Sequence, residues 1–287
     1  MTKGIGIENN SHNSNNNDTT TTTRTSAPIF NDGISDYSQD QIIDALKRVG
    51  IKKGDSIFVH SSLKSFGKIC KGITKEYFLN AFLASLTETV GTEGNIIMPT
   101  FSYSFCKNQT FDPQKTPSTV GILTESFRKM KDVKRSTDPI FSIAVLGKDS
   151  DYFASVGTNC FGKNSIFEKL YYKDVKLMFI GDTFDITYMH FVEQKFGVTY
   201  RFIKKFKGII KMGDSEQETE VDYNVRPLDK DIEYDLEAIA SHFDRCGILR
   251  KTALGNSKIR VVGAVDAHDA IMKEFKTNEC FLLKTEK

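Results

Sequence analysis

The sequence predicts an α/β protein whose C-terminal part carries an antiparallel extension. Short apolar segments of strand length recur along the chain, and segments with the apolar spacing of a helix stand between them. Because strands buried on both faces read as continuous apolar runs, these segments indicate a largely parallel sheet. Near residues 201–225 the alternation changes, and two neighbouring strands are expected to form a hairpin that turns at Gly213 and Asp214.

Each expected element has a local reason. Ser38 and Gln41 are spaced as a capping box before a helix that stops at Gly50, and a second helix ends at Gly91. The apolar runs predict strands over 55–60, 95–101, 141–147, 175–181 and 258–265. Helical spacing predicts helices over 40–50, 75–91, 121–130, 165–172, 185–197, 231–247 and 266–275.

The N-terminal segment differs in composition from the rest. Residues 9–26 are almost entirely Asn, Thr and Ser, which cannot bury enough apolar surface to offset the entropy of ordering. Residues 1–27 are therefore expected to be disordered, and residues 28–287 to form a single domain, because no linker-like segment interrupts them. No secretory signal or apolar run of about 20 residues is visible, so a cytoplasmic protein without a membrane span is expected.

Charge and cysteine usage exclude several classes of function. The net charge of +2 argues against a strongly electrostatic nucleic-acid binder. The five cysteines are scattered without a C-x-x-C pair, which indicates reduced thiols and small core residues, and no metal site is expected. The P-loop, dinucleotide and nucleophile-elbow motifs are also absent from the sequence.

The segment "DITYMHFVEQKFG" (185–197) holds the strongest catalytic candidates. Thr187, His190 and Glu193 stand three residues apart, on the side of the expected helix opposite its apolar face. Glu193 could hold one imidazole nitrogen of His190 while the other takes a proton, and Thr187 could donate to a developing oxyanion. An ordinary amphipathic helix with its polar side in water would give the same pattern.

Other polar clusters follow the expected strands, where ligands of open α/β sheets bind. "VHSSLKS" (59–65) offers hydroxyls and Lys64 to a phosphate, although serines that cap their own loop would look the same. "KRSTDPIFS" (134–142) holds Arg135, which could meet a phosphate, and Asp138, which could meet an ammonium group; a plain Asp-Pro turn is the alternative. Glu125 and Arg128 are spaced as a surface ion pair.

In their order along the chain, these segments resemble the family of aminoglycoside 3-N-acetyltransferases. The resemblance covers residues 54–197 most clearly, and the tail to residue 283 also fits. The matching segments are "GDSIFVHSSLKSFG", "VGTEGNIIMPTFSYS", "FDPQKTPSTVGILTESFRKM", "RSTDPIFSIAVLG", "NSIFEKL" and "LMFIGDTFDITYMHFVEQKFG". The resemblance implies a three-layer α/β/α sandwich, acetyl-coenzyme A or a longer acyl-coenzyme A as donor, and a primary amine on a sugar as acceptor.

By position, the resemblance also implies site residues. His190 would be the base, Glu193 its partner, and Thr187 and Asp182 would line the catalytic site. The residues implied for coenzyme A are His60, Ser61, Ser62, Leu63, Lys64, Ser65, Ser102, Arg135 and Ser136. Those implied for the acceptor are Tyr103, Glu125 and Asp138. In the expected mechanism Glu193 makes His190 more basic, and no metal takes part.

One departure bears on the acceptor. The antibiotic-modifying members read R-S-x-H-P where this chain has "RSTDP", so that Asp138 stands in place of a histidine. This form is similar to relatives that acylate nucleotide-linked amino sugars, and such a sugar is therefore the expected acceptor. The alternatives are an aminoglycoside 3-N-acetyltransferase that confers antibiotic resistance, or a non-catalytic coenzyme A-binding relative. A metal-dependent amidohydrolase is a more distant alternative, and homo-oligomerisation is left open.

Overall fold

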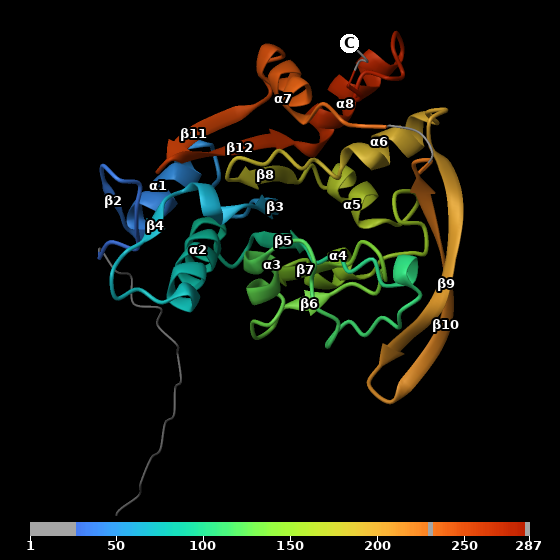
Figure 1. Cartoon of the computed structure of the whole chain (residues 1–287), viewed down its shortest axis with the longest axis horizontal. Helices are drawn as coiled ribbons and strands as arrows, with labels where there is room; N and C mark the ends of the chain where they lie inside the picture. Colours follow the sequence, from blue (N-terminus) through green and yellow to red (C-terminus); the bar gives the residue numbers. More distant parts are fainter. Residues whose placement is uncertain (1–26, 229–231, 285–287) are drawn as a thin grey trace, which may run out of the picture.

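A seven-stranded sheet forms the centre of the computed structural model, which describes residues 27–228 and 232–284. The segment 1–26, for which disorder is predicted, lies outside the described residues. The strand order is β11-β12-β8-β3-β5-β7-β6 (Figure 1). The strands are β3 (Ser56–Ser61), β5 (Asn95–Pro99), β6 (Lys134–Arg135), β7 (Ile143–Gly147), β8 (Lys176–Ile180), β11 (Arg250–Leu254) and β12 (Ser257–Gly263).

The sheet is mixed, which corrects the expectation of a largely parallel one. Strand β3 pairs in parallel with β5 and β8, whereas the other four pairings in the described part of the sheet are antiparallel. Short connections account for two of these four pairings: seven residues join β6 to β7, and a tight turn at Gly255 joins β11 to β12. Connections this short return the chain antiparallel, and a central strand reads as the same apolar run in either direction.

Helices cover both faces of the sheet, as the predicted three-layer fold requires. One apolar core joins the sheet to α1 (Gln39–Arg48), α2 (Lys75–Val90) and α3 (Ile122–Phe127). The other core lies beneath α4 (Ser150–Ala154), α5 (Ile166–Tyr172), α6 (Met189–Phe196), α7 (Leu236–Arg245) and α8 (Ala264–Phe275). Alternate strand residues feed the two cores: Ile57 and Val59 of β3 face α1 and α2, and Phe58 faces α5.

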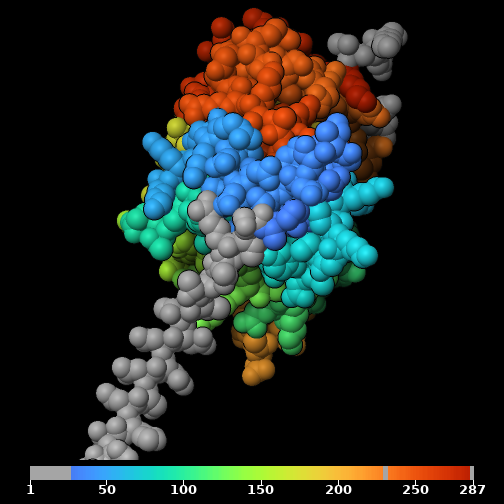
Figure 2. Space-filling model, turned by 90° about the vertical axis from the view of Figure 1, so that its left-hand side faces the viewer, coloured from blue at the N-terminus to red at the C-terminus, as the bar shows by residue number. Residues whose placement is uncertain are grey.

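The first described residues are held to the rest of the fold by strand pairing and hydrogen bonds. The predicted capping box forms, with Ser38 and Gln41 exchanging both of its hydrogen bonds at the start of α1. A small three-stranded sheet was not predicted from the sequence. Two of its strands, β1 (Phe30–Asn31) and β2 (Asp36–Tyr37), come before this helix in the chain, and β4 (Lys68–Ile69) comes after it. Arg48 donates to Thr252 of β11, and Figure 2 shows the blue N-terminal residues seated against the orange and red C-terminal ones.

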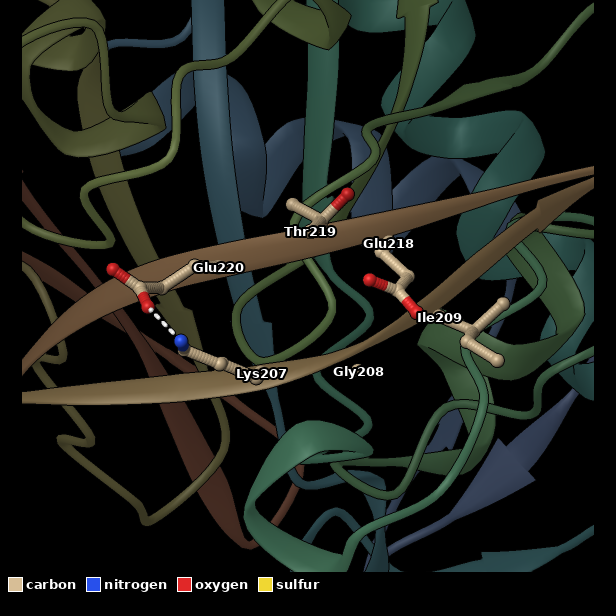
Figure 3. Close-up of a pocket in the computed structure, with 6 residues that line it drawn as sticks. All are labelled: Lys207, Gly208, Ile209, Glu218, Thr219 and Glu220. Atoms are coloured by element: carbon tan, nitrogen blue, oxygen red, sulfur yellow. Dashed lines mark ion pairs between the residues drawn. The ribbon is translucent and has the colours of Figure 1, made fainter.

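The antiparallel extension is a hairpin of β9 (Phe202–Met212) and β10 (Ser215–Val225), which turns at Gly213 and Asp214 as predicted. It forms the long curved arm at the right of Figure 1. Its outer face carries a cross-strand ladder in which Lys207 lies opposite Glu220, and the two form an ion pair (Figure 3). A surface hollow of about 490 Å³ lies along this part of the arm.

Two strand ends meet at the edge of the sheet where ligands are expected. Ser61 at the end of β3 pairs with Ile180 at the end of β8, so the loops that follow lie side by side. Gly181 makes this approach possible, because it has φ +110° and any side chain there would overlap the carbonyl oxygen of Ser62. The short 3-10 helix η1 (Leu63–Ser65) continues from Ser62, whereas η2 (Phe105–Lys107) follows β5.

We predict that Gly181→Ala separates these two loops. The substitution combines a left-handed backbone, worth about 1–2 kcal/mol, with overpacking against Ser62, worth about 1–3 kcal/mol more. Gly72→Ala is the matched control, since Gly72 has φ +86° and open space around it. Urea unfolding of both variants should show the larger loss for Gly181→Ala; equal losses would mean that the close approach is not a constraint.

Candidate active site

Helix α6 places its polar side in the interior, not in water. The helix begins at Met189, later than predicted, and Thr187 lies just before it, with its carbonyl accepting from the His190 backbone N–H. The Glu193 side chain is 0% exposed, and that of His190 is 16% exposed. The alternative of an ordinary amphipathic helix with its polar side in water is therefore wrong, because later segments of the chain cover this side.

The Glu193 carboxylate receives hydrogen bonds from four side chains. His190 Nδ1 lies 2.6 Å from Oε2, and Nη1 of Arg201 donates to the same oxygen at 2.9 Å. The hydroxyls of Tyr200 and Tyr234 donate to Oε1 at 2.8 Å and 2.9 Å. A buried carboxylate needs such partners, because the interior offers no water to replace them. The predicted pairing of His190 with Glu193 is thus present, within a larger network.

Arg201 joins this network to the base of the hairpin arm. Its Nε and Nη2 donate to the carbonyl oxygen of Asn224 on β10 at 2.9 Å and 2.6 Å, and Nη1 donates to the Tyr234 hydroxyl at 2.6 Å. The same Nη1 lies 2.8 Å from Nδ1 of His190. The Arg201 side chain is only 2% exposed, so the cation is fixed in place by the backbone behind it.

Glu193 raises the pKa of His190, as expected, but it does not decide the net direction. Burial lowers the pKa of His190 and the Arg201 cation lowers it further, and together they outweigh the opposite effect of Glu193. For Glu193, burial raises the pKa, but His190, Arg201 and Tyr200 bring it below its ordinary value. Both shifts favour an ionised carboxylate beside a neutral imidazole, which is the form of histidine that accepts a proton.

Aromatic rings form the walls around His190. Phe161 meets the imidazole edge-on, with the ring centroids 5.2 Å apart, and Tyr234 approaches in the same manner at 5.3 Å. Burial and the Glu193 charge raise the pKa of both Tyr200 and Tyr234, so their hydroxyls stay protonated donors. No side chain in the described parts of the chain hydrogen-bonds to Nε2 of His190, which leaves this nitrogen for a ligand.

The end of β3 lies on the same face of the sheet. His60 stacks on Phe179 with ring centroids 5.7 Å apart, and burial lowers its pKa to about 3, so it is a neutral ring in the wall of the site. Ser61 and Ser62 are half-buried, Leu63 is buried, and Lys64 is exposed without an ion pair to any residue that the structure describes. Ser65 donates to Ser257, which in turn donates to Asp182 at 2.6 Å.

Tyr103 and Asp185 lie near each other beyond the ends of β5 and β8. Tyr103 has a left-handed backbone with φ 54°, uncommon for a large side chain and often associated with a functional position. Burial raises its pKa to about 12, and the charge of Asp185 acts in the same direction. The structure thus adds Asp185 to the predicted acidic residue Asp182 at this edge of the sheet.

Three residues predicted to contact coenzyme A are engaged inside the protein instead. The Arg135 guanidinium donates to the carbonyls of Pro113, Thr116 and Thr100 and to the hydroxyl of Ser142, and burial lowers its pKa to about 10. The hydroxyl of Ser136 accepts from the Ile143 N–H, and Ser102 donates to the carbonyl of Pro139. Their donors and acceptors hold loops together, so a direct role on the ligand is not supported.

Two residues predicted for the acceptor have a similar explanation. Glu125 pairs with Arg128 and Lys129; burial would raise its pKa, but these partners lower it to about 2. Asp138 is 6% exposed, and one of its oxygens accepts from the N–H groups of Ile140 and Phe141. Burial raises its pKa. Neither carboxylate is an open partner for an ammonium group.

Sequence reasoning missed Arg201, Tyr200 and Tyr234. Arg201 and Tyr200 stand between the glycine that ends α6 and the start of β9, and Tyr234 comes 41 residues after Glu193. No motif marks them, because Tyr200 and Arg201 lie in an irregular segment after α6, and Tyr234 reaches Glu193 only when the chain returns from the hairpin. The expectation of buried cysteines was also wrong for Cys106, Cys246 and Cys280, which are exposed, whereas Cys160 is buried.

Residues 27–228 and 232–284 hold no group of three or more His, Cys, Asp or Glu side chains placed to bind a metal ion. Over the same ranges, every helix is too short or too polar to span a bilayer.

The fold and this site agree with comparisons to known proteins. A model of the family described as aminoglycoside 3-N-acetyltransferase matches residues 58–276, and the chain belongs to this family. The SPbeta prophage-derived aminoglycoside N(3')-acetyltransferase-like protein YokD of Bacillus subtilis (strain 168) is 28% identical over 55% of this chain. Aminoglycoside N(3)-acetyltransferase IV of Salmonella sp is 27% identical over 42% of the chain. The matches span 65% and 43% of these relatives' own length.

Solved structures share the fold at low identity. The apoenzyme of the aminoglycoside acetyltransferase AAC(3)-IVa superposes with a TM-score of 0.72 and 18% identity, covering 88% of this chain and 94% of that one. The binary complex of AAC-IIIb with CoASH gives 0.72 and 20%, covering 88% and 99%. AAC-VIa bound to sisomicin gives 0.71 and 20%, covering 84% and 98%. These likenesses confirm the predicted three-layer fold.

We predict that Glu193→Gln costs about 3–5 kcal/mol of folding stability, because it leaves the Arg201 cation buried without its counter-ion. The matched control is Glu220→Gln on the arm, which removes an exposed pair with Lys205 and Lys207 and should cost less than about 1 kcal/mol. Guanidinium unfolding at pH 7.5 measures both. Similar losses in the two variants would contradict the buried ion pair.

Proposed function

We propose that the protein is an acyl-coenzyme A-dependent N-acetyltransferase that acts on a primary amine of an aminoglycoside. The observation that carries the proposal is the position of His190: its Nδ1 lies 2.6 Å from the buried carboxylate of Glu193, and no side chain of residues 27–228 and 232–284 hydrogen-bonds to its Nε2. Family membership and the coenzyme A complex of the similar AAC-IIIb structure support the donor.

The donor would lie along the loop after β3. The hydroxyls of the half-buried Ser61 and Ser62 suit phosphate and amide groups, as does the exposed ammonium of Lys64. Lys64 is exposed at the rim, as expected of a residue that meets the outer, charged part of a long ligand. His60 would pack against the inner part of the donor as an uncharged ring, since burial lowers its pKa to about 3.

Direct transfer from the thioester to the amine suits these residues. Nε2 of His190 takes a proton from the acceptor ammonium, and the amine attacks the thioester carbonyl carbon. A C–N bond forms and the C–S bond breaks. The proton held on His190 passes to the departing thiolate, and the second proton that the nitrogen loses on becoming an amide goes to solvent. Thr187, three residues before His190, would donate to the oxyanion. A covalent enzyme intermediate is not required.

The acceptor expectation changes in favour of an aminoglycoside. A nucleotide-linked amino sugar is not supported, because the matching family and the relatives given above are named for aminoglycosides. Asp138, whose presence favoured the nucleotide sugar, is buried and closes a turn. The exposed carboxylates of Asp182 and Asp185 suit a polycationic acceptor by simple charge attraction.

We predict that His190→Gln lowers kcat for acetyl transfer by about 10²–10⁴-fold, because the amide cannot take a proton. Thiol release from acetyl-coenzyme A in the presence of an aminoglycoside panel measures transfer, and calorimetry with coenzyme A measures the donor site. Donor binding should be retained. Wild-type turnover by His190→Gln would refute the base, and no turnover by the wild type would favour the non-catalytic coenzyme A-binding alternative.

A second prediction concerns the donor rim. Lys64→Ala should raise the KM for acetyl-coenzyme A about fivefold, which is about 1 kcal/mol for an exposed charge pair, with kcat nearly unchanged. Lys68→Ala is the control, since Lys68 is also exposed but lies on β4. If both variants keep the wild-type KM, Lys64 does not contact the donor.

A further inference from the structure

The close approach of Arg201 Nη1 to His190 Nδ1 is not a hydrogen bond donated by the arginine. Nη1 of Arg201 carries two hydrogens, and these are used by Glu193 Oε2 at 2.9 Å and by the Tyr234 hydroxyl at 2.6 Å. Nδ1 of His190, 2.8 Å from Nη1, is therefore left to donate its own hydrogen to Glu193 Oε2. This tautomer places the free lone pair on Nε2, to which no side chain in the described part of the protein donates.

A single negative charge cannot balance two cations in this space. Arg201 is always charged, and although burial works against its charge, Glu193 raises its pKa above the ordinary value. Protonating His190 would put a second cation 2.8 Å from the first, inside a region where charges are weakly screened. Glu193 is thus already neutralised by Arg201, and the imidazole gains little from being charged.

The structure fixes the position of the cation from behind. Both Nε and Nη2 of Arg201 point to the carbonyl of Asn224, so the guanidinium cannot swing away when His190 takes a proton. Other titratable and charged groups around His190 are Glu193 on its own helix, Tyr200 before β9, and Tyr234 and Arg226 after the hairpin. Arg226 is a second cation and acts in the same direction as Arg201.

We propose that Arg201 is a positioning residue for the transfer reaction: as the permanent counter-ion of Glu193, it keeps His190 unprotonated and its Nε2 available as the base. This inference rests on the proposed function. As a consequence, Arg201 should set the lower pH limit of activity. A neutral imidazole is required for catalysis, and Arg201 extends that form toward acid. Without Arg201, the Glu193 charge would act on His190 alone, and the pKa of His190 would rise.

The test is an NMR titration of His190 in the whole chain, with imidazoles labelled and the His190 resonance assigned from its loss in His190→Gln. The wild-type midpoint is expected below the ordinary histidine value of about 6.5. Arg201→Met should move it upward by at least about one pH unit, a tenfold change in proton affinity, whereas Arg201→Lys should restore a low midpoint. Tyr234→Phe is the control, because it removes a neutral donor of Glu193 without changing charge.

A wild-type midpoint at or above about 6.5 would overturn the proposal even if Arg201→Met failed to fold. An unshifted midpoint in folded Arg201→Met would do the same. A merely structural arginine would lower stability in Arg201→Met and Arg201→Lys alike, without separating their midpoints. The acid limb of kcat/KM should follow the midpoints. Since the titration needs no turnover, an inactive protein with the predicted order of midpoints would refute the acetyltransferase function and leave the role of Arg201 on His190 intact.

Discussion

The buried carboxylate of Glu193 is the constraint on which this end of the molecule depends. An isolated charge in the interior would be costly, and here it is tolerated because three separate segments bring four donors to it. One of these segments follows α6 directly and precedes β9, whereas the segment before α7 lies beyond the hairpin. The network around Glu193 is therefore complete only when the chain has passed through the hairpin and returned to α6.

This arrangement gives the two sides of the predicted site different physical characters. Around His190 the groups are buried, their positions are fixed by hydrogen bonds, and burial and fixed charge dominate the pKa values. At the end of β3, Ser61 and Ser62 are half-buried and Lys64 is exposed to solvent. His190, held in a fixed position beside the exposed Lys64 at the end of β3, would suit the proposed reaction between a long flexible donor and a polar acceptor.

The sequence predicted local features well and long-range ones poorly. Capping at Ser38, the turn at Gly213 and the apolar strands depend on near neighbours, and all are present. Strand direction and the contact of Arg135 with Thr100 depend on residues far along the chain, and the approach of Arg201 to Glu193 depends on the path of an irregular segment. Periodicity encodes neither. His190 and Glu193 were found because both lie within one helical turn; Arg201 was missed because only the folded chain brings it there.

The hairpin arm is held in two ways that respond differently to ionic strength. Toward its tip the strands are linked by exposed pairs such as Lys211 with Glu216, which salt screens over about 8–10 Å. At its base the link is the buried contact of Arg201 with Glu193 and the Asn224 carbonyl, which dissolved ions cannot reach. Rising salt is therefore expected to weaken the ion pairs toward the tip of the arm and to leave the contact at its base unchanged, while the backbone pairing of the two strands persists along the whole arm.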